Sequence, residues 1–140
     1  LIGGGMSLAS AMGETGLTAI MGSKLDAILT IPPILLIVVL TALVIFLTEI
    51  ISNTAITAAM LPILFGLGAN NPTSPLSLVI PGTLAASCAF MLPIGTPPNA
   101  VVFGTGRLPM RTMMGYGMAL NLLGTLLIPG LMCLFGWILF

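Results

Sequence analysis

The sequence contains no histidine, and charged residues make up only 4% of its 140 positions. Without histidine, the chain cannot supply a Ser-His-Asp triad, a Cys-His pair or a histidine ligand for a metal ion. Three basic residues balance three acidic ones, so the sequence has no excess charge of the kind that attracts nucleic acid. The two cysteines, Cys88 and Cys133, are too few for a four-thiolate site and do not form a CxxC pair.

Hydrophobic residues are abundant, at 58% of the chain with a mean hydropathy of +1.25. A soluble domain carries about 25% charged residues, so this composition predicts an all-α integral membrane protein. The sequence begins at Leu1, without a methionine or the features of a signal peptide. We therefore expect a fragment of a longer protein, whose missing part would cover polar side chains that lipid cannot satisfy.

The apolar stretch from Ile34 to Leu67 is too long for one membrane helix. As a single helix it would measure roughly 50 Å, against a hydrocarbon core of about 30 Å. It must therefore break, either as a re-entrant helical hairpin or as two ordinary spans. The second arm, from Ala55 to Leu67, is shorter than a span, which favours the hairpin. The expected segments are an interfacial amphipathic helix with a connector (1–30), the hairpin (31–75), a discontinuous transmembrane helix (76–106) and a C-terminal transmembrane helix (107–140).

The basic residues suggest an orientation in the membrane. Arg107 and Arg111 lie in or beside a short loop, which the positive-inside rule places in the cytoplasm. The hairpin would then open from the opposite face and the C-terminus would lie outside, with Trp137 as an interfacial anchor.

The first break is predicted at Ser52, Asn53 and Thr54, because these residue types cap helix N-termini. The free N–H groups of the following helix and these side chains can converge on an anion. The alternative is that these side chains only form hydrogen bonds between membrane helices. Glu49 stands one turn earlier, and either a structural hydrogen-bonding role or proton coupling would explain an acidic residue there.

The second break is predicted between Gly95 and Asn99. Pro97 and Pro98 cannot donate to the carbonyls of Pro93 and Ile94, and such unpaired oxygens attract a cation such as sodium. Thr96 precedes this half-helix as the Ser52 triplet precedes the first, and we expect it to contribute a second set of donors for an anion. The alternative is a simple proline kink. Paired interruptions of this kind are the best pointer from sequence to a transporter's binding site.

Two motifs resemble those of a known family. The residues from Thr48 to Ala55 are similar to the second Ser-Asn-Thr motif of the divalent anion:sodium symporters, and those from Phe90 to Ala100 are similar to that family's Thr-Pro-Pro-Asn signature. The resemblance covers essentially the whole chain, as the C-terminal repeat. It implies an inverted-repeat, homodimeric, elevator-type carrier, multi-pass in the cell (inner) membrane. Such a carrier moves a di- or tricarboxylate such as succinate, malate or citrate, or sulfate, with sodium.

The resemblance also implies roles for individual residues. Substrate contacts would come from Ser52, Asn53, Thr54, Thr96 and Pro97, and sodium ligands from Thr48, Ile51, Asn53 and Gly95. The partners would be a small dianion, the missing N-terminal half, a second protomer and the lipid bilayer. One rival is a proton-coupled or arsenite-type anion permease of the same superfamily that uses Glu49. A rival of another class is a structural membrane subunit without a transport site. An enzyme is not expected, since no base could activate Ser52.

Overall fold

A computed structural model describes residues 7, 11, 14–16, 32–69 and 74–139, with side chains up to Phe135 at the C-terminal end. The elements of this part are all helical: α4 (Pro33–Thr48), α5 (Asn53–Ala69), α6 (Leu76–Ala85), α7 (Pro97–Gly104) and α8 (Met110–Leu139). The predicted all-α fold is confirmed. Most of the segment predicted as an interfacial helix (1–30), and the side chain of Trp137, lie outside what the structure describes.

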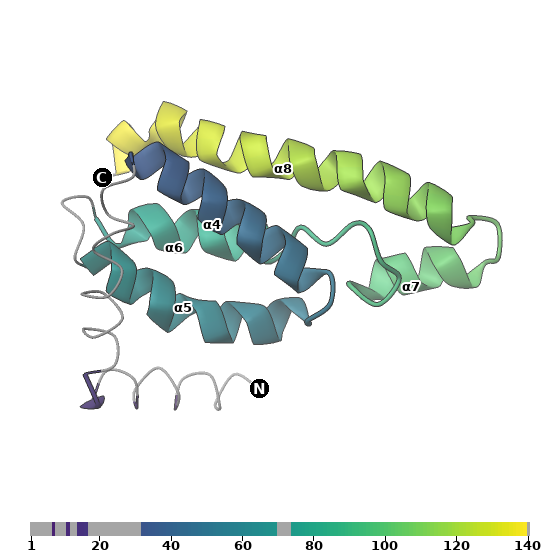
Figure 1. Cartoon of the computed structure of the whole chain (residues 1–140), viewed down its shortest axis with the longest axis horizontal. Helices are drawn as coiled ribbons and strands as arrows, with labels where there is room; N and C mark the ends of the chain where they lie inside the picture. The colour runs from purple at the N-terminus through teal and green to yellow at the C-terminus, as the bar shows by residue number, and fades with distance from the viewer. Residues whose placement is uncertain (1–6, 8–10, 12–13, 17–31, 70–73, 140) are drawn as a thin grey trace.

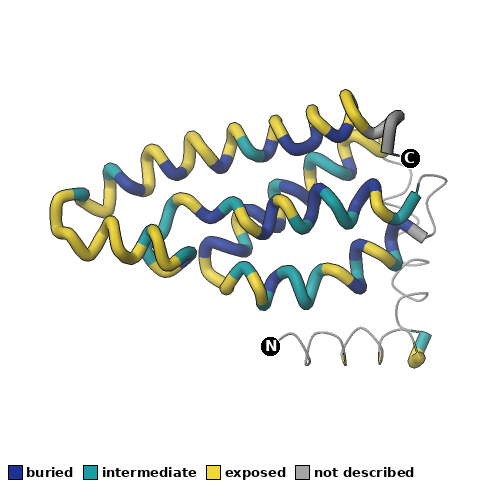
Figure 2. The backbone as a smooth tube through the Cα atoms, turned by 180° about the vertical axis from the view of Figure 1, so that it is seen from behind, coloured by how far each residue is buried: buried dark blue, intermediate teal, exposed yellow. Residues whose placement is uncertain are grey.

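Three of the helices form a bundle with the second half of α8. Helix α4 packs against both α8 and α6, and α5 packs chiefly against α6. Figure 1 shows these elements together at one end of the molecule, while α7 and the first half of α8 extend beyond them. Helix α7 has no buried residue, and Figure 2 shows that the buried positions gather where α4, α5, α6 and α8 meet.

The bundle core consists of two apolar clusters. One joins α4, α5 and α8 to the end of α6, and the other joins α4, α5 and α6 nearer the start of α4. Their buried members are Val44, Ile45, Ile56, Ala85, Ala86 and Ile128 in the first, and Leu36, Leu64, Leu67 and Leu78 in the second. Packing of the second cluster depends on Gly82, since a Cβ there would collide with the side chain of Leu64.

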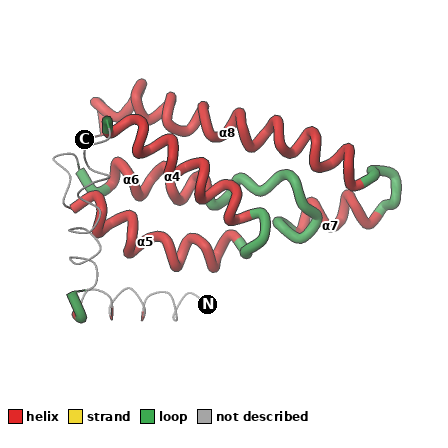
Figure 3. Tube along the Cα trace, viewed as in Figure 1, coloured by secondary structure: helices red, strands yellow, loops and turns green. Residues whose placement is uncertain are grey.

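The turn between α4 and α5 follows directly from local sequence. Helix α4 begins behind Pro32 with Pro33 in its first turn, where a missing N–H costs nothing. It ends at Thr48, and α5 begins at Asn53, so residues 49–52 form the turn (Figure 3). The Ser52 hydroxyl accepts a hydrogen bond from the Ala55 amide at 3.2 Å and caps α5.

The break within 76–106 is wider than the sequence suggested. Helix α6 already ends at Ala85 and α7 starts at Pro97, so residues 86–96 are non-helical instead of only residues 95–99. Pro81, expected at the entrance of this segment, lies inside α6. Contacts from Thr48 and Glu49 hold this segment in its non-helical conformation.

Within the described residues, one helix is long and apolar enough to cross a membrane, namely Met110–Phe135 of α8. The loop with Arg107 lies at one end of the molecule, and the start of α4 and the C-terminal end of α8 lie at the other (Figure 1). The open end of the α4–α5 hairpin therefore lies at the end of the molecule opposite the loop with Arg107.

Candidate substrate and sodium site

The N-terminus of α5 presents free hydrogen-bond donors. Ser52 satisfies the amide of Ala55 through its hydroxyl and that of Ile56 through its carbonyl. Among the described residues, no acceptor is bonded to the amides of Asn53 and Thr54. Two unpaired N–H groups at the positive end of a helix, beside exposed Ser52 and Thr54 side chains, form a suitable site for a carboxylate.

The N-terminus of α7 is different, which corrects the expectation of two equivalent donor sets. Pro97 and Pro98 have no N–H group, and the next two amides, those of Asn99 and Ala100, are bonded to the side chain and carbonyl of Thr96. The first turn of α7 thus has no unpaired amide. Its contribution to an anion site reduces to the hydroxyl proton of Thr96, which stays available because the oxygen only accepts from Asn99.

Two of the predicted sodium ligands lie in direct contact. The buried Thr48 hydroxyl oxygen lies 2.7 Å from Asn53 Oδ1 and 2.9 Å from the carbonyl oxygen of Ala86. A hydroxyl has a single proton, so it can satisfy only one of these two acceptors. When Thr48 donates to Ala86, two oxygen atoms with available lone pairs lie side by side, and a cation that contacts both would be stabilised.

The other two predicted sodium ligands are backbone carbonyls. Among the described residues, no hydrogen bond reaches the carbonyl oxygens of Ile51 or Gly95, so both retain their capacity to bind a cation. Gly95 lies beside the same turn, since a Cβ built on it would be 3.3 Å from Oε2 of Glu49. All four predicted sodium ligands are oxygen atoms, which are the atoms that bind sodium where transporters unwind their helices.

Thr48 and Glu49 hold the segment after α6 out of a continuous helix. In a continuous helix the amide of Phe90 would bond to the carbonyl of Ala86. Here the Thr48 hydroxyl bonds that carbonyl at 2.9 Å, and Glu49 Oε1 accepts from the Phe90 amide at 2.7 Å. The last residue of α4 and the first residue of the hairpin turn therefore replace both halves of one helical hydrogen bond.

Glu49 makes further contacts of the same kind. Its carboxylate accepts from the amides of Met91 and Leu92 at 2.9 and 3.0 Å and from Nδ2 of Asn121 on α8 at 2.7 Å. Every one of these contacts uses Glu49 as an acceptor. Of the two roles considered for Glu49, this geometry supports structural hydrogen bonding. Asn121 was not identified from the sequence, where its only signal is an amide side chain within the apolar C-terminal segment.

Asn99 completes the break from the α7 side. Its Nδ2 donates to the carbonyls of Ala89 at 2.9 Å and Leu92 at 3.1 Å. Pro93 has no N–H and so leaves the Ala89 carbonyl without its helical partner, which is the position that Asn99 fills. The side-chain Nδ2 of Asn99 therefore stabilises the conformation of the break.

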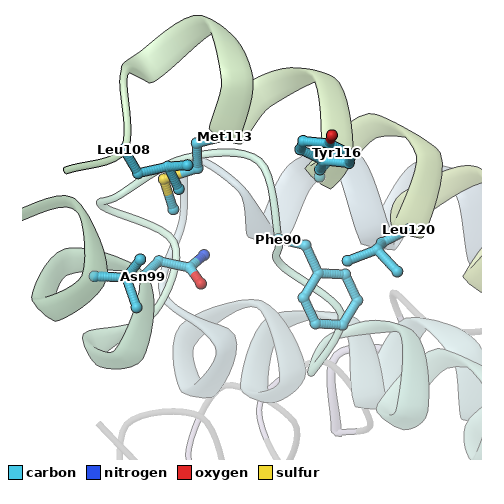
Figure 4. Close-up of a pocket in the computed structure, with 8 residues that line it drawn as sticks. Phe90, Asn99, Leu108, Met113, Tyr116 and Leu120 are labelled. Carbon is cyan, nitrogen blue, oxygen red and sulfur yellow. The ribbon is translucent and has the colours of Figure 1, made fainter.

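A cavity of about 210 Å³ lies between the break, α7 and α8. Figure 4 shows Phe90, Asn99, Met113 and Tyr116 around it. Its lining is mostly apolar, and none of the predicted substrate or sodium residues contributes to it. The candidate site is therefore the pair of helix breaks and not this cavity.

A hairpin turn and a helix break that bring unpaired amides and oxygen atoms together resemble the discontinuous helices at which secondary transporters bind ions and substrates. Comparison with known proteins agrees with this class. The chain belongs to the family described as the sodium:sulfate symporter transmembrane region, whose model matches residues 1–140. This is a transporter family and not an enzyme family, and the resemblance inferred from the two motifs is confirmed.

Three similar proteins are named as sodium-coupled dicarboxylate transporters. The chain is 45% identical over 128 residues to the sodium-dependent dicarboxylate transporter SdcS of Staphylococcus saprophyticus, covering 91% of this chain and 25% of that protein. It is 42% identical to the Na(+)/dicarboxylate cotransporter 3 of Rattus norvegicus and 41% identical to that of Homo sapiens, covering 91% of this chain and 21% of each relative. The chain thus spans a quarter or less of the length of these relatives.

Proposed function

We propose that this chain forms the C-terminal repeat of a secondary transporter that couples sodium to the uptake of a divalent anion, namely a di- or tricarboxylate such as succinate, malate or citrate. The observation that carries the proposal is the meeting of the two helix breaks through Thr48 and Glu49. The names of the relatives, which are sodium-dependent dicarboxylate transporters, support the choice of ion and substrate class.

In this proposal the anion binds at the tip of the hairpin. The free amides of Asn53 and Thr54, with the Ser52 and Thr54 hydroxyls, would hold one carboxylate at the positive end of α5. The Thr96 hydroxyl would donate to the second carboxylate, with Pro97 in contact beside it. Because α7 lacks a free amide in its first turn, the α5 end would supply most of the attraction.

Sodium would be held between Thr48, Asn53 and the carbonyls of Ile51 and Gly95. It would act as a co-substrate that moves with the anion. Its charge would satisfy the two facing oxygens of Thr48 and Asn53, 2.7 Å apart, and would bring the tip and the break to the geometry in which the anion binds.

The lengths of the helices support a re-entrant hairpin. Helices α4 and α5, with 16 and 17 residues, measure about 24–26 Å at 1.5 Å per residue, less than a core of about 30 Å. The turn contacts α8 at Asn121. From this contact, α8 extends past the tip of the hairpin for roughly 16 Å, back to its first residue, Met110. We propose that the hairpin tip ends within the membrane, and that α6, the break and α7 form one discontinuous transmembrane helix.

The size of the relatives supports a larger assembly. They are about four times as long as this chain, so the matching first Ser-Asn-Thr motif and the second sodium site would belong to an N-terminal repeat of inverted orientation. We propose a homodimeric, elevator-type carrier, multi-pass in the cell (inner) membrane, on the resemblance of the two motifs.

Uptake of radiolabelled succinate into proteoliposomes containing the complete protein tests the proposal. Replacing external sodium by choline while keeping a pH gradient should abolish uptake. Undiminished uptake would instead favour the proton-coupled permease. Asn53→Ala and Thr96→Val should each abolish uptake at an unchanged amount of protein in the membrane, whereas a structural subunit would tolerate both.

A further inference from the structure

Three separate segments meet at the carboxylate of Glu49. Glu49 itself belongs to the turn after α4, three residues before the Ser52 cap of α5. The amides of Phe90, Met91 and Leu92 come from the break, and Asn121 comes from α8. Only 3% of Glu49 is exposed, so no water replaces these contacts.

The geometry demands an acceptor with two oxygens at this place. Oε1 receives the amides of Phe90 and Met91 and the side chain of Asn121, while Oε2 receives the amide of Leu92. A glutamine would turn an NH₂ group toward at least one of these donors. The break therefore holds its shape around a carboxylate, at one turn from the proposed anion site and next to the proposed sodium ligand Thr48.

Asn121 reaches the same carboxylate at a cost to itself. The residue is completely buried, its Nδ2 faces Glu49 because a carboxylate accepts but does not donate, and its Oδ1 has no partner among the described residues. A leucine of similar size would leave no buried acceptor unpaired and would suit an apolar helix better. The arrangement thus favours the position of the carboxylate over the stability of α8.

We propose that Glu49 and Asn121 are positioning residues that couple the two binding sites of the transporter. Asn121 fixes the Glu49 carboxylate from α8, and the carboxylate fixes the break, so that Gly95 stays beside Glu49 when sodium binds. This inference rests on the proposed function and adds residues to it that contact neither sodium nor substrate. Without the pair, sodium organises the two breaks less effectively, and anion uptake requires a higher sodium concentration.

Asn121→Leu and Glu49→Gln in the complete protein test the inference, with Thr41→Val as the matched control. Thr41 is on α4, is 1% exposed, and has a hydroxyl without a partner among the described residues. Its replacement by valine should therefore change nothing. For Asn121→Leu we expect the sodium concentration for half-maximal succinate uptake to rise about tenfold, with maximal rate reduced less than threefold. Glu49→Gln should give a larger rise of the same kind.

Hydrogen exchange provides a readout that does not require transport. In purified wild-type protein, sodium should slow exchange of the amides of residues 90–92. In Asn121→Leu, these amides should exchange at least tenfold faster than in Thr41→Val, with or without sodium. If wild-type protein shows no sodium-dependent uptake but this exchange pattern holds, the proposed function fails and the positioning pair stands.

Three results would overturn the inference. One is a sodium dependence in Asn121→Leu and Glu49→Gln within twofold of that in Thr41→Val. Another is unchanged exchange at residues 90–92 in both variants. The third is loss of folded protein in both variants, since that would identify the pair as necessary for folding alone.

Discussion

The close approach of the break to α8 can be tested at a single glycine. Gly117 lies one helical turn before Asn121, and a Cβ built there would be 2.5 Å from the Cα of Met91 and 2.6 Å from the carbonyl carbon of Phe90. These are backbone atoms, which cannot swing aside as a side chain can. Ordinary contacts of a Cβ begin at 3.4 Å, so Gly117→Ala must move the break away from α8 by about 1 Å, as an overpacked site does.

Such a shift acts on the hydrogen bonds to Glu49. The Phe90 and Met91 amides lie 2.7 and 2.9 Å from Oε1, and a displacement of about 1 Å breaks at least one of these bonds. Loss of a hydrogen bond to a charged group costs about 1.5–3 kcal/mol, and about 1.4 kcal/mol corresponds to a factor of ten. We therefore expect sodium-dependent succinate uptake by Gly117→Ala to fall by roughly 10- to 100-fold at an equal amount of protein in the membrane.

Gly115→Ala is the matched control for this experiment. Gly115 lies on the same helix, and a Cβ there would meet nothing within 4 Å. Alanine also favours a helix over glycine by about 0.5–1 kcal/mol, so uptake by this variant should equal that of the wild type. Equal uptake by Gly117→Ala and Gly115→Ala in the same proteoliposome assay would show that the break does not rest against α8 in the complete protein.

Three further substitutions address the tip and the break. Ser52→Asp retains a good cap for α5 but places a negative charge beside the proposed anion site. The melting temperature should therefore stay unchanged, while the KM for succinate should rise more than tenfold. An unchanged KM would show that Ser52 is not part of the site. Asn99→Leu leaves two carbonyls without their side-chain donor and should destabilise the protein by about 2–4 kcal/mol. Thermal unfolding in detergent measures this loss. An unchanged unfolding transition would show that Asn99 does not stabilise the break. Gly95→Ala brings a Cβ to 3.1 Å from that of Ala89, a contact that a small adjustment relieves. The sodium concentration for half-maximal uptake should therefore stay within about threefold of that of the wild type. A tenfold rise in a sodium titration would contradict this geometry.

The places of the two interruptions could be predicted from sequence because their causes are local. Ser52 caps the helix that follows it, and prolines remove specific helical donors, so both effects are visible within a few residues. The same local reasoning placed Thr96 before α7. It overestimated the donors there, because the hydroxyl and carbonyl of Thr96 already bond the amides of Asn99 and Ala100.

The width of the second break and the role of Asn121 could not be predicted in this way. No glycine or proline lies between Ala86 and Phe90, and this segment is held out of a helix by Thr48 and Glu49, which lie about 40 residues away along the chain and bond the Ala86 carbonyl and the Phe90 amide. Asn121 lies 72 residues from Glu49 in sequence. A single asparagine on an apolar helix forms no pattern that identifies such a partner.

The two breaks are consequently one physical unit. Thr48 binds the acceptor and Glu49 the donor of a single absent helical bond between Ala86 and Phe90. Removing one of these contacts leaves a buried polar group unpaired in the break, and removing both allows that helical bond to form again. The effects of substitutions at Thr48 and Glu49 on the break should therefore not add, as is general for residues that share one hydrogen-bond network. If sodium binds at the hairpin tip as proposed, the ion would act directly on the helix break that Thr48 and Glu49 hold open, and through that break on the proposed anion site.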